Sequence, residues 1–233
     1  MARETNRELL TKPDNDQLDA SITGFLFHAA PFALLPGTHQ ALEWLIRRFA
    51  IQHHNVDALL EFALPYHATK LFARVVQLLD FASHTRWQFL TAVKKTGAPL
   101  DRATLIKRCA ADNGMLAFVC EMPGRALAQE PPPPSVSHLV TFTVSLVLGS
   151  IERRVTTNSV TVILPLVLSS LQRDRADCRA SALMIIAQLA SSTSLAPATS
   201  TALFELVRCV RGLHMAVCAL LCMCGYAWMC VYG

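Results

Sequence analysis

The sequence predicts an all-α fold, specifically an α-solenoid of antiparallel helix pairs. Residues 38–81 carry three successive apolar stripes with spacings of i, i+3, i+4 and i+7, which is typical of amphipathic helices. Residues 158–191 add two helical stretches joined by the polar turn QRDRAD. Such helices bury their apolar faces by stacking on neighbours, as helical repeats do. The three stripes are Leu42, Leu45, Ile46 and Phe49; Val56, Leu59, Leu60 and Ala63; and Phe72, Val75, Val76 and Leu79.

Capping residues set the expected limits of the first helices. The first helix is expected to begin at Asp14 or Asp16 as its N-cap. Thr38 should cap the helix with the first stripe, and Asn55 the helix with the second. Pro65 should bend or end that second helix after Leu64, because proline disfavours a helical conformation in the residue before it. The buried face of the first helix is predicted to contain Leu18, Ile22, Phe25 and Leu26.

Two short helices are predicted over residues 87–114. The first should end at Gly97, because glycine tolerates the left-handed conformation that follows many helices. Asp101 should cap the second, and Asn113–Gly114 should close it. The apolar residues of the first are Trp87, Leu90 and Val93, and those of the second are Leu105, Ile106 and Cys109.

The second half begins with a proline run. Pro131–Pro134 cannot be helical and is expected to form an extended, solvated linker. Residues 135–149 are rich in β-branched side chains typical of strands, but the helical spacing of Leu139, Phe142 and Leu146 and the helical neighbourhood favour a helix. The helix pair of 158–191 follows, and a last helix is expected at 198–211. The second helix of the pair is predicted to turn Ala180, Leu183, Met184 and Ala187 inward.

Composition excludes several classes of protein. The chain is 52% apolar and 16% charged, so most of it can fold around a core and is not intrinsically disordered. A net charge of +4 is too small to indicate a nucleic-acid binder by itself. The polar N-terminus has no apolar core of a secretory signal, which predicts a reducing compartment where the eight cysteines are thiols.

The sequence predicts no catalytic, cofactor or metal site. It contains neither a Gly-x-Ser-x-Gly elbow nor a phosphate-binding glycine loop. His53, His54 and His67, with Asp57 nearby, are the one cluster that suggests a metal, but their spacing matches neither a helical histidine pair nor a zinc finger. We interpret them as surface or turn histidines. The cysteines near the C-terminus also lack a Cys-x-x-Cys pair.

Basic residues on the polar faces or ends of successive helices form the candidate binding site. In a solenoid they can align into a ridge that meets RNA phosphates or acidic protein segments. The alternative is an ordinary solvated face, because the acids Glu43, Asp57, Glu61 and Asp80 are interleaved with them. Trp44 and Trp87 are expected to pack between helices rather than stack on bases. The ridge residues are Arg47, Arg48, Lys70, Arg74, Lys94, Lys95, Lys107 and Arg108, and Arg86 belongs to the same series.

Several segments resemble a known family. Residues 158–191 resemble a HEAT repeat: Leu164–Pro165–Leu166 matches its proline-bearing first helix, and Cys178–Arg179 the start of its second. More specific are RELLTKPDNDQLDASITGFL, LEWLIRRFAIQHHNVDALLEFALPYHATKLFARVVQLL and VKKTGAPLDRATLIKRC. These strings resemble the N-terminal region of the HEAT-repeat-containing protein 1 family, very large components of the small-subunit processome. The resemblance runs from about Arg7 to Arg211 and weakens at 120–150 and 192–211.

The resemblance implies a function. Members of that family are non-enzymatic nucleolar scaffolds of the U3 small nucleolar ribonucleoprotein assembly. They support precursor rRNA processing toward 18S rRNA and rRNA transcription by RNA polymerase I. The implied partners are processome proteins, with U3 RNA or precursor rRNA contacted directly or through them; no cofactor or small-molecule substrate is implied. Because family members are several times longer, the chain is expected to be a fragment, a short isoform or a partial gene product.

Together these features predict five segments. They are a polar lead-in at 1–13, a helical-repeat array at 14–130, a proline-rich linker at 131–135, HEAT-like helix pairs at 136–211, and an atypical apolar, cysteine-rich tail at 212–233. The proline run and the tail depart from the family pattern, since a continuing helical array is expected in both places.

The tail supports an alternative function, a tail-anchored membrane adaptor. Residues 212–233 carry no Asp, Glu, Lys or Arg, and the last nineteen reach the roughly 20-residue length that spans a bilayer. Arg208 and Arg211 flank them on the side expected to stay cytosolic. Against an anchor, the stretch contains Gly225, ends abruptly and resembles translated non-coding sequence. Our preferred hypothesis is therefore a splice- or gene-prediction-derived end that replaces the next helix and leaves apolar surface exposed.

Overall fold

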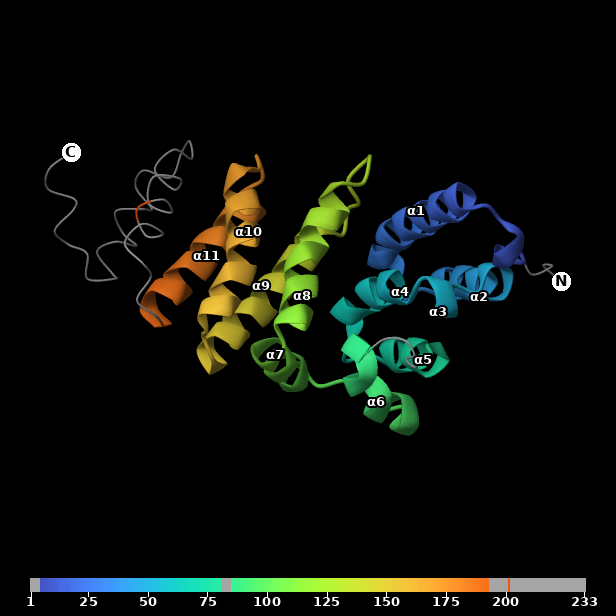
Figure 1. Cartoon of the computed structure of the whole chain (residues 1–233), viewed down its shortest axis with the longest axis horizontal. Coiled ribbons are helices and arrows are strands. Elements are labelled where there is room, and N and C mark those ends of the chain that lie inside the picture. The colour runs from blue at the N-terminus through green and yellow to red at the C-terminus, as the bar shows by residue number, and fades with distance from the viewer. Residues whose placement is uncertain (1–4, 81–84, 193–200, 202–233) are drawn as a thin grey trace, which may run out of the picture. The chain divides into compact units, whose positions relative to one another are not determined.

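The computed structural model describes residues 5–80, 85–192 and 201. Across these residues the regular secondary structure is helical, with no strand, so the all-α prediction is confirmed. The chain divides into two compact units (Figure 1): unit 1 comprises residues 1–105 and 125–139, and unit 2 comprises 106–124 and 140–233. The predicted five-segment division stays a prediction.

Among the described residues before position 100, ten helical elements begin within unit 1. The α-helices are α1 (Lys12–Ala29), α2 (Pro36–Phe49), α3 (Ile51–His54), α4 (Val56–Ala63), α5 (Lys70–Leu78) and α6 (Thr91–Thr96). The 3₁₀ helices are η1 (Arg7–Leu9), η2 (Ala30–Phe32), η3 (Leu64–Tyr66) and η4 (Thr85–Leu90). The rest of the described chain forms α7 (Arg102–Ala111), α8 (Asn113–Leu127), α9 (Val136–Arg153), α10 (Thr157–Gln172) and α11 (Ala176–Ser192).

Helix α4 is the centre of unit 1. It packs against α1 and α5, and Figure 1 shows it between them. Its predicted stripe is completely buried, and Glu61 and Phe62 are buried as well, so little of its surface meets water. A short helix that is enclosed in this way gains its stability from packing on its neighbours rather than from intrinsic helix propensity. In unit 2, α10 and α11 pack as the predicted pair.

Several predicted helix ends are confirmed. Pro65 lies in η3, directly after α4 ends, and Gly97 follows α6 in the left-handed conformation with φ 66°. Asp101 Oδ2 accepts a hydrogen bond from the Ala103 amide at the start of α7. The helix favoured over a strand at 135–149 forms as α9.

Other predicted caps are wrong. Thr11, not Asp14 or Asp16, is the N-cap of α1; its hydroxyl accepts from the Asp14 amide, and Pro13 occupies the first turn, where a missing N–H costs nothing. Likewise Pro36 starts α2, which places Thr38 inside the helix.

The predicted end of α7 at Asn113–Gly114 is also wrong, because α8 begins there. The carboxylate of Asp112 accepts from the amides of Gly114 and Met115 and so starts the next helix.

Two predicted buried faces need correction. In α1, Phe25 is exposed, whereas Phe27 joins Ile22 and Leu26 in the core. In α11 the side chains predicted to face inward do not form the core face, and Met184 is 54% exposed. The buried residues of α11 are Cys178, Ala182, Ile185 and Leu189. Because α11 is apolar on several sides, its periodicity fits more than one face, and packing against α10 selects among them.

The proline run is non-helical, as predicted, but it is not solvated throughout. Pro133 is buried. The Pro131 carbonyl lies 3.1 Å from His28 Nε2, and the Ser135 hydroxyl donates to the Phe27 carbonyl at 3.2 Å. These contacts hold the run against the end of α1, within unit 1.

A buried arginine joins the first residues of the chain to two helices. Arg7 Nε donates to Asn15 Oδ1 at 3.2 Å, and Nη1 donates to Asn55 Oδ1 at 3.0 Å. Its Nη2 pairs with Asp19, whose Oδ1 also accepts from Asn55 Nδ2 at 2.8 Å. Asn55 therefore stands at the predicted N-cap position of α4, but its side chain makes no capping hydrogen bond and serves this network instead.

Replacing Arg7 with alanine should destabilise the chain by about 3 kcal/mol, because the change strands polar partners around a side chain that is 4% exposed. Urea unfolding measures the difference. Arg47→Ala is the control: its ion pair with Glu43 is exposed and should contribute no more than about 0.5 kcal/mol. Equal losses for the two variants would contradict the structural role of the Arg7 network.

Ala50, between α2 and α3, has φ 49° and ψ 41°, which is the left-handed region. Ala50→Gly should stabilise the chain by about 0.5–1 kcal/mol, since relief of the left-handed cost exceeds the extra entropy of unfolded glycine. Ala58→Gly, within α4, is the control for the same chemical change and should destabilise by about 1 kcal/mol. Thermal and urea unfolding test both variants. If Ala50→Gly destabilised the chain, the left-handed conformation assigned to Ala50 would be contradicted.

Candidate partner and nucleic-acid interface

The eight predicted ridge residues occupy four helices. Arg47 and Arg48 end α2, Lys70 and Arg74 lie on α5, and Lys94 and Lys95 lie on α6, all in unit 1. Lys107 and Arg108 lie on α7, in unit 2. We therefore consider the six residues of unit 1 by themselves, and a ridge of all eight stays a prediction.

The two arginines of α2 already have intramolecular contacts. Arg47 pairs with Glu43 one turn earlier on the exposed side of the helix. The Arg48 guanidinium lies 5.9 Å from the centre of the Phe49 ring, within cation–π range. Contacts within α2 therefore already compensate part of the positive charge of these two side chains.

Lys94 and Arg108 also serve the fold. Lys94 Nζ donates to the Leu79 carbonyl just beyond α5, where a helix C-terminus favours a cation. Arg108 Nη2 lies 2.6 Å from Asp112 Oδ2, at the junction of α7 and α8. Both side chains therefore already have partners within the chain.

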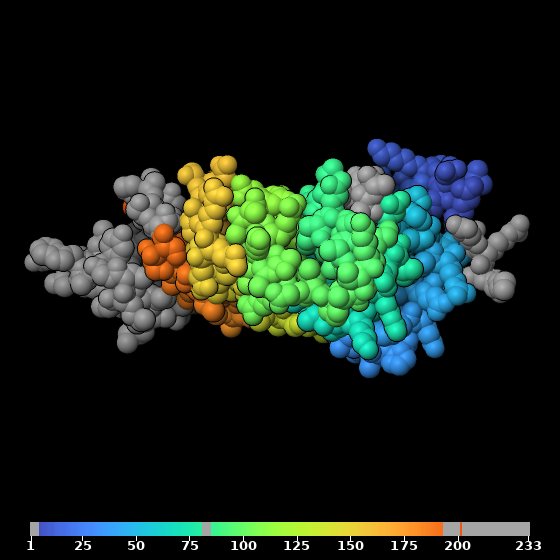
Figure 2. Space-filling view, turned by 90° about the horizontal axis from the view of Figure 1, so that it is seen from below, coloured from blue at the N-terminus to red at the C-terminus, as the bar shows by residue number. Residues whose placement is uncertain are grey.

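Lys70, Arg74 and Lys95 remain, on two helices that pack against each other, and we call this group the α5–α6 basic face. All three are exposed, and among the described residues none is paired with an acid. Lys70 and Arg74 stand one turn apart on α5, opposite the buried stripe. Helix α6 packs on α5 and presents Lys95. Figure 2 shows the teal and green surface of these helices from outside.

Three of the four acids that alternate with these cations in sequence are engaged by other side chains of unit 1. Glu61 is buried and paired with Arg125 at 3.0 Å. Asp57 accepts a hydrogen bond from Trp87 Nε1 at 2.6 Å. Glu43 is paired on α2. Three of the four interleaved acids are therefore occupied elsewhere in unit 1, and the reason for expecting a neutral solvated face is weakened.

Charge is concentrated in this part of the chain. Residues 70–96 contain five basic side chains and one acid, Asp80, so their net charge of +4 equals that of the whole chain. A local excess of exposed cations attracts phosphates or carboxylates much more strongly than the same charge spread over the molecule.

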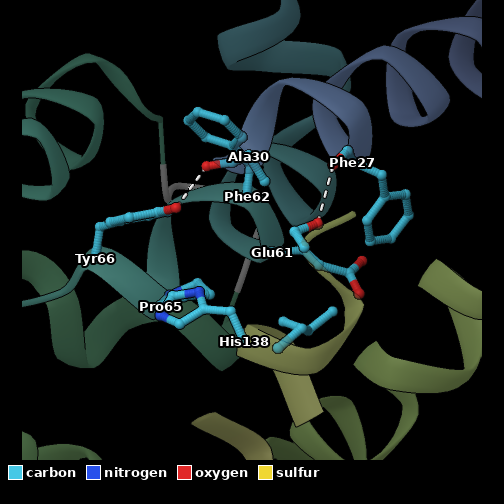
Figure 3. Close-up of a pocket in the computed structure, with 9 residues that line it drawn as sticks. Phe27, Ala30, Glu61, Phe62, Pro65, Tyr66 and His138 are labelled. Atoms are coloured by element: carbon cyan, nitrogen blue, oxygen red, sulfur yellow. Dashed lines mark hydrogen bonds between the residues drawn. The ribbon is translucent and has the colours of Figure 1, made fainter. Parts of the chain in front are cut away.

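One pocket of unit 1 is too small for a substrate. It lies where α1, α4, η3 and the start of α9 meet (Figure 3), and it has room for about one water molecule. Small-molecule sites usually enclose about 300–1,000 Å³. In Figure 3 the Tyr66 hydroxyl points to the Ala30 carbonyl, which accepts its hydrogen bond at 2.5 Å. Burial raises the pKa of Tyr66 and so keeps the phenol protonated.

The histidines do not converge on a metal site in the part of the chain that the structure describes. His53 and His54 are exposed on α3, and His67 Nδ1 lies 2.8 Å from the Leu100 carbonyl. Among described residues, no three metal-ligating side chains gather closely enough to hold an ion. Burial, followed by the nearby Arg7 charge, lowers the pKa of His54 and favours its neutral form.

The prediction for the two tryptophans was half right. Trp87 is completely buried, but Trp44 is 50% exposed on α2. A large aromatic at helical spacing gave no sign of which side it would face.

Among the described residues, no helix combines the length and the apolar composition needed to cross a bilayer. The predicted helix at 198–211 and the tail at 212–233 lie outside those residues, apart from Thr201.

The chain matches no family model. It is 35% identical over 202 residues to HEAT repeat-containing protein 1 of Homo sapiens, a match covering 84% of this chain and 9% of the relative. The protein of the same name from Danio rerio is 33% identical over 79% of this chain and 9% of its own length. U3 small nucleolar RNA-associated protein 10 of Mycosarcoma maydis is 40% identical over 104 residues, 45% of this chain and 5% of that protein.

Stacked helix pairs and these similarities together define the class: an α-solenoid of HEAT-like repeats. More particularly, the chain is homologous to a segment of HEAT repeat-containing protein 1. It spans about 9% of the length of these relatives. The resemblance stated from the sequence is thereby confirmed.

Buried thiols give a test of this structure. Burial raises the pKa of Cys109 and of Cys120 to about 12, so at pH 8 about one thiol in 10⁴ is a thiolate. N-ethylmaleimide should leave both unmodified in the native chain and label both in guanidinium, as peptide mass spectrometry can show. The two thiols bind their protons more tightly in the folded chain than in the unfolded chain. The free energy of unfolding should therefore fall as pH rises past about 9, where the thiols of the unfolded chain lose their protons. Rapid native labelling would contradict this burial.

Proposed function

We propose that this chain is a non-enzymatic scaffold segment that acts in ribosome biogenesis, within the small-subunit processome of the nucleolus. The observation that carries the proposal is its homology, over 84% of its length, to a segment of HEAT repeat-containing protein 1. The name of the fungal relative adds an association with U3 small nucleolar RNA. Within this assembly the chain would support precursor rRNA processing toward 18S rRNA and rRNA transcription by RNA polymerase I.

The mechanism we propose is docking through several helix-pair surfaces, which hold processome proteins and precursor RNA in register. A solenoid suits this role because each added helix pair extends the available surface. The α5–α6 basic face is the proposed RNA contact: its exposed cations can neutralise phosphates without reading bases. Two cavities of unit 1 each have room for about one water molecule, which is compatible with a function carried by surfaces.

Imaging tests the proposed location. An N-terminally tagged chain should concentrate in nucleoli, with or without residues 212–233, and should recover U3 RNA on purification. Chains carrying the α5–α6 substitutions described next provide a comparison for RNA recovery. Membrane signal that disappears on removal of 212–233 would contradict the scaffold proposal and support a tail-anchored adaptor instead.

Charge reversal tests the basic face. The triple variant Lys70→Glu, Arg74→Glu and Lys95→Glu should bind single-stranded RNA more weakly. The slope of log K against log salt should fall by about 2, because each lost phosphate contact on a single strand removes about 0.7. Fluorescence anisotropy at several salt concentrations measures both quantities, and circular dichroism confirms folding.

The matched control reverses three other cations of unit 1: Lys12→Glu, Arg47→Glu and Arg48→Glu. It makes the same change in net charge but leaves α5 and α6 intact, so its salt slope should stay close to that of the unmodified chain. Equal effects of the two triple variants would mean that overall charge governs RNA binding, and the α5–α6 face would lose its assigned role.

A further inference from the structure

A second surface of unit 1 presents large apolar side chains to solvent. Phe32, Leu34 and Leu35, on the turn between α1 and α2, are each more than half exposed. Trp44, farther along α2, is half exposed. Single exposed apolar residues are common on proteins, but a local series of large ones is typical of a surface that binds another molecule.

The turn holds its apolar side chains in a defined conformation. The Ala33 amide donates to the Ala30 carbonyl at 3.1 Å, and the Leu35 amide donates to the Phe32 carbonyl at 2.9 Å. Prolines stand on both sides, at positions 31 and 36, and restrict the backbone further. A preformed turn loses little conformational entropy on binding, so its exposed side chains can contribute fully to affinity.

Helix α2 extends this surface. Its core side is Thr38, Leu42 and Leu45, which leaves Gly37, Gln40, Glu43, Trp44 and Arg47 on the outward side. A Cβ atom added at Gly37 would meet nothing within 4 Å, so the beginning of α2 is open. The Trp44 ring packs edge-to-face on Phe49, with centroids 5.4 Å apart, which orients the indole while half of the residue stays exposed.

The charges of this surface indicate the chemistry of the molecule that binds it. Between residues 30 and 49 the acid is Glu43, already paired with Arg47, whereas both Arg47 and Arg48 lie in the last turn of α2. The surface therefore presents large apolar side chains at the turn and at Trp44, with Arg47 beyond Trp44 at the end of the helix. Its complement is an apolar surface that carries an acid at the matching end.

We propose that Phe32, Leu34, Leu35, Trp44 and Arg47 form a docking surface for an amphipathic helix of a protein partner. Leucine- or phenylalanine-type side chains of that helix would pack on the turn and on Trp44, and an acidic side chain would face Arg47. Exposed leucines favour protein over RNA, because bases stack on aromatic rings but gain little from aliphatic side chains. Trp and Arg are also the residues most enriched at energetically important interface positions. This inference rests on the proposed scaffold function and names one class of partner.

A photo-crosslinking amino acid at position 44 of the full chain, activated in cells, identifies what covers the surface. The same amino acid at Gln77, exposed on α5, is the control. Position 44 should crosslink to a protein segment with large apolar residues at i, i+3 or i+4, and i+7, and with an acid at one end. A synthetic peptide of that segment should bind the purified chain, and Trp44→Ala should weaken binding at least tenfold.

Charge exchange supplies the sharper test. The Arg47→Glu variant should bind the peptide more weakly than the unmodified chain does. A peptide whose acid is replaced by lysine should regain affinity for the Arg47→Glu variant but not for the unmodified chain. Crosslinks to RNA, to a second copy of the chain, or equally from position 77 would overturn the proposal, as would no crosslink at all. Nucleolar location and U3 recovery are separate readouts: if they persist without the crosslink, the docking surface is wrong and the scaffold function stands.

Discussion

The enclosure of α4 is the constraint on which unit 1 depends. This short helix buries its whole predicted stripe and two further side chains against α1 and α5. Eight residues of helix are marginal in water, so α4 exists because its neighbours remove it from water, and they in turn bury their apolar sides on it. Caps such as Thr11 and Thr69 set where the neighbouring helices begin.

That same enclosure determines how the charges of unit 1 are used. A buried charge must be paired, since leaving it unpaired costs several kcal/mol. Glu61 on α4 therefore takes Arg125 as its partner, and Arg7 is surrounded by Asp19 and two asparagines. Acids that are already paired within the folded chain are not available to neutralise exposed lysines and arginines. The basic face of α5 and α6 is in this sense a consequence of core packing.

The candidate surfaces lie on separate helices and differ in chemistry. The α5–α6 face is cationic and hydrophilic, suited to a polyanion, whereas the turn before α2 and the outward side of α2 are mainly apolar. Scaffolds bind several partners through such separate patches, and the helix pairs of a solenoid can display them without a shared cavity. Homology to segments of much larger proteins is compatible with this arrangement, because each stretch of a solenoid contributes its own contacts.

Local chemistry in the sequence determined that the chain is helical and where many helices end. Apolar spacing marked the stripes of α2, α4 and α5, and the breaks at Pro65 and Gly97 follow from backbone sterics within a few residues. The basic residues could also be identified from the sequence. Only the tertiary structure decided that Lys70, Arg74 and Lys95 have no acidic partner among the described residues, while Arg47, Lys94 and Arg108 have partners. It also decided that Trp44 faces out and that α11 buries Cys178 rather than Met184. Exposure and ion pairing also depend on which distant residues pack beside a side chain, and periodicity along one helix does not specify those residues.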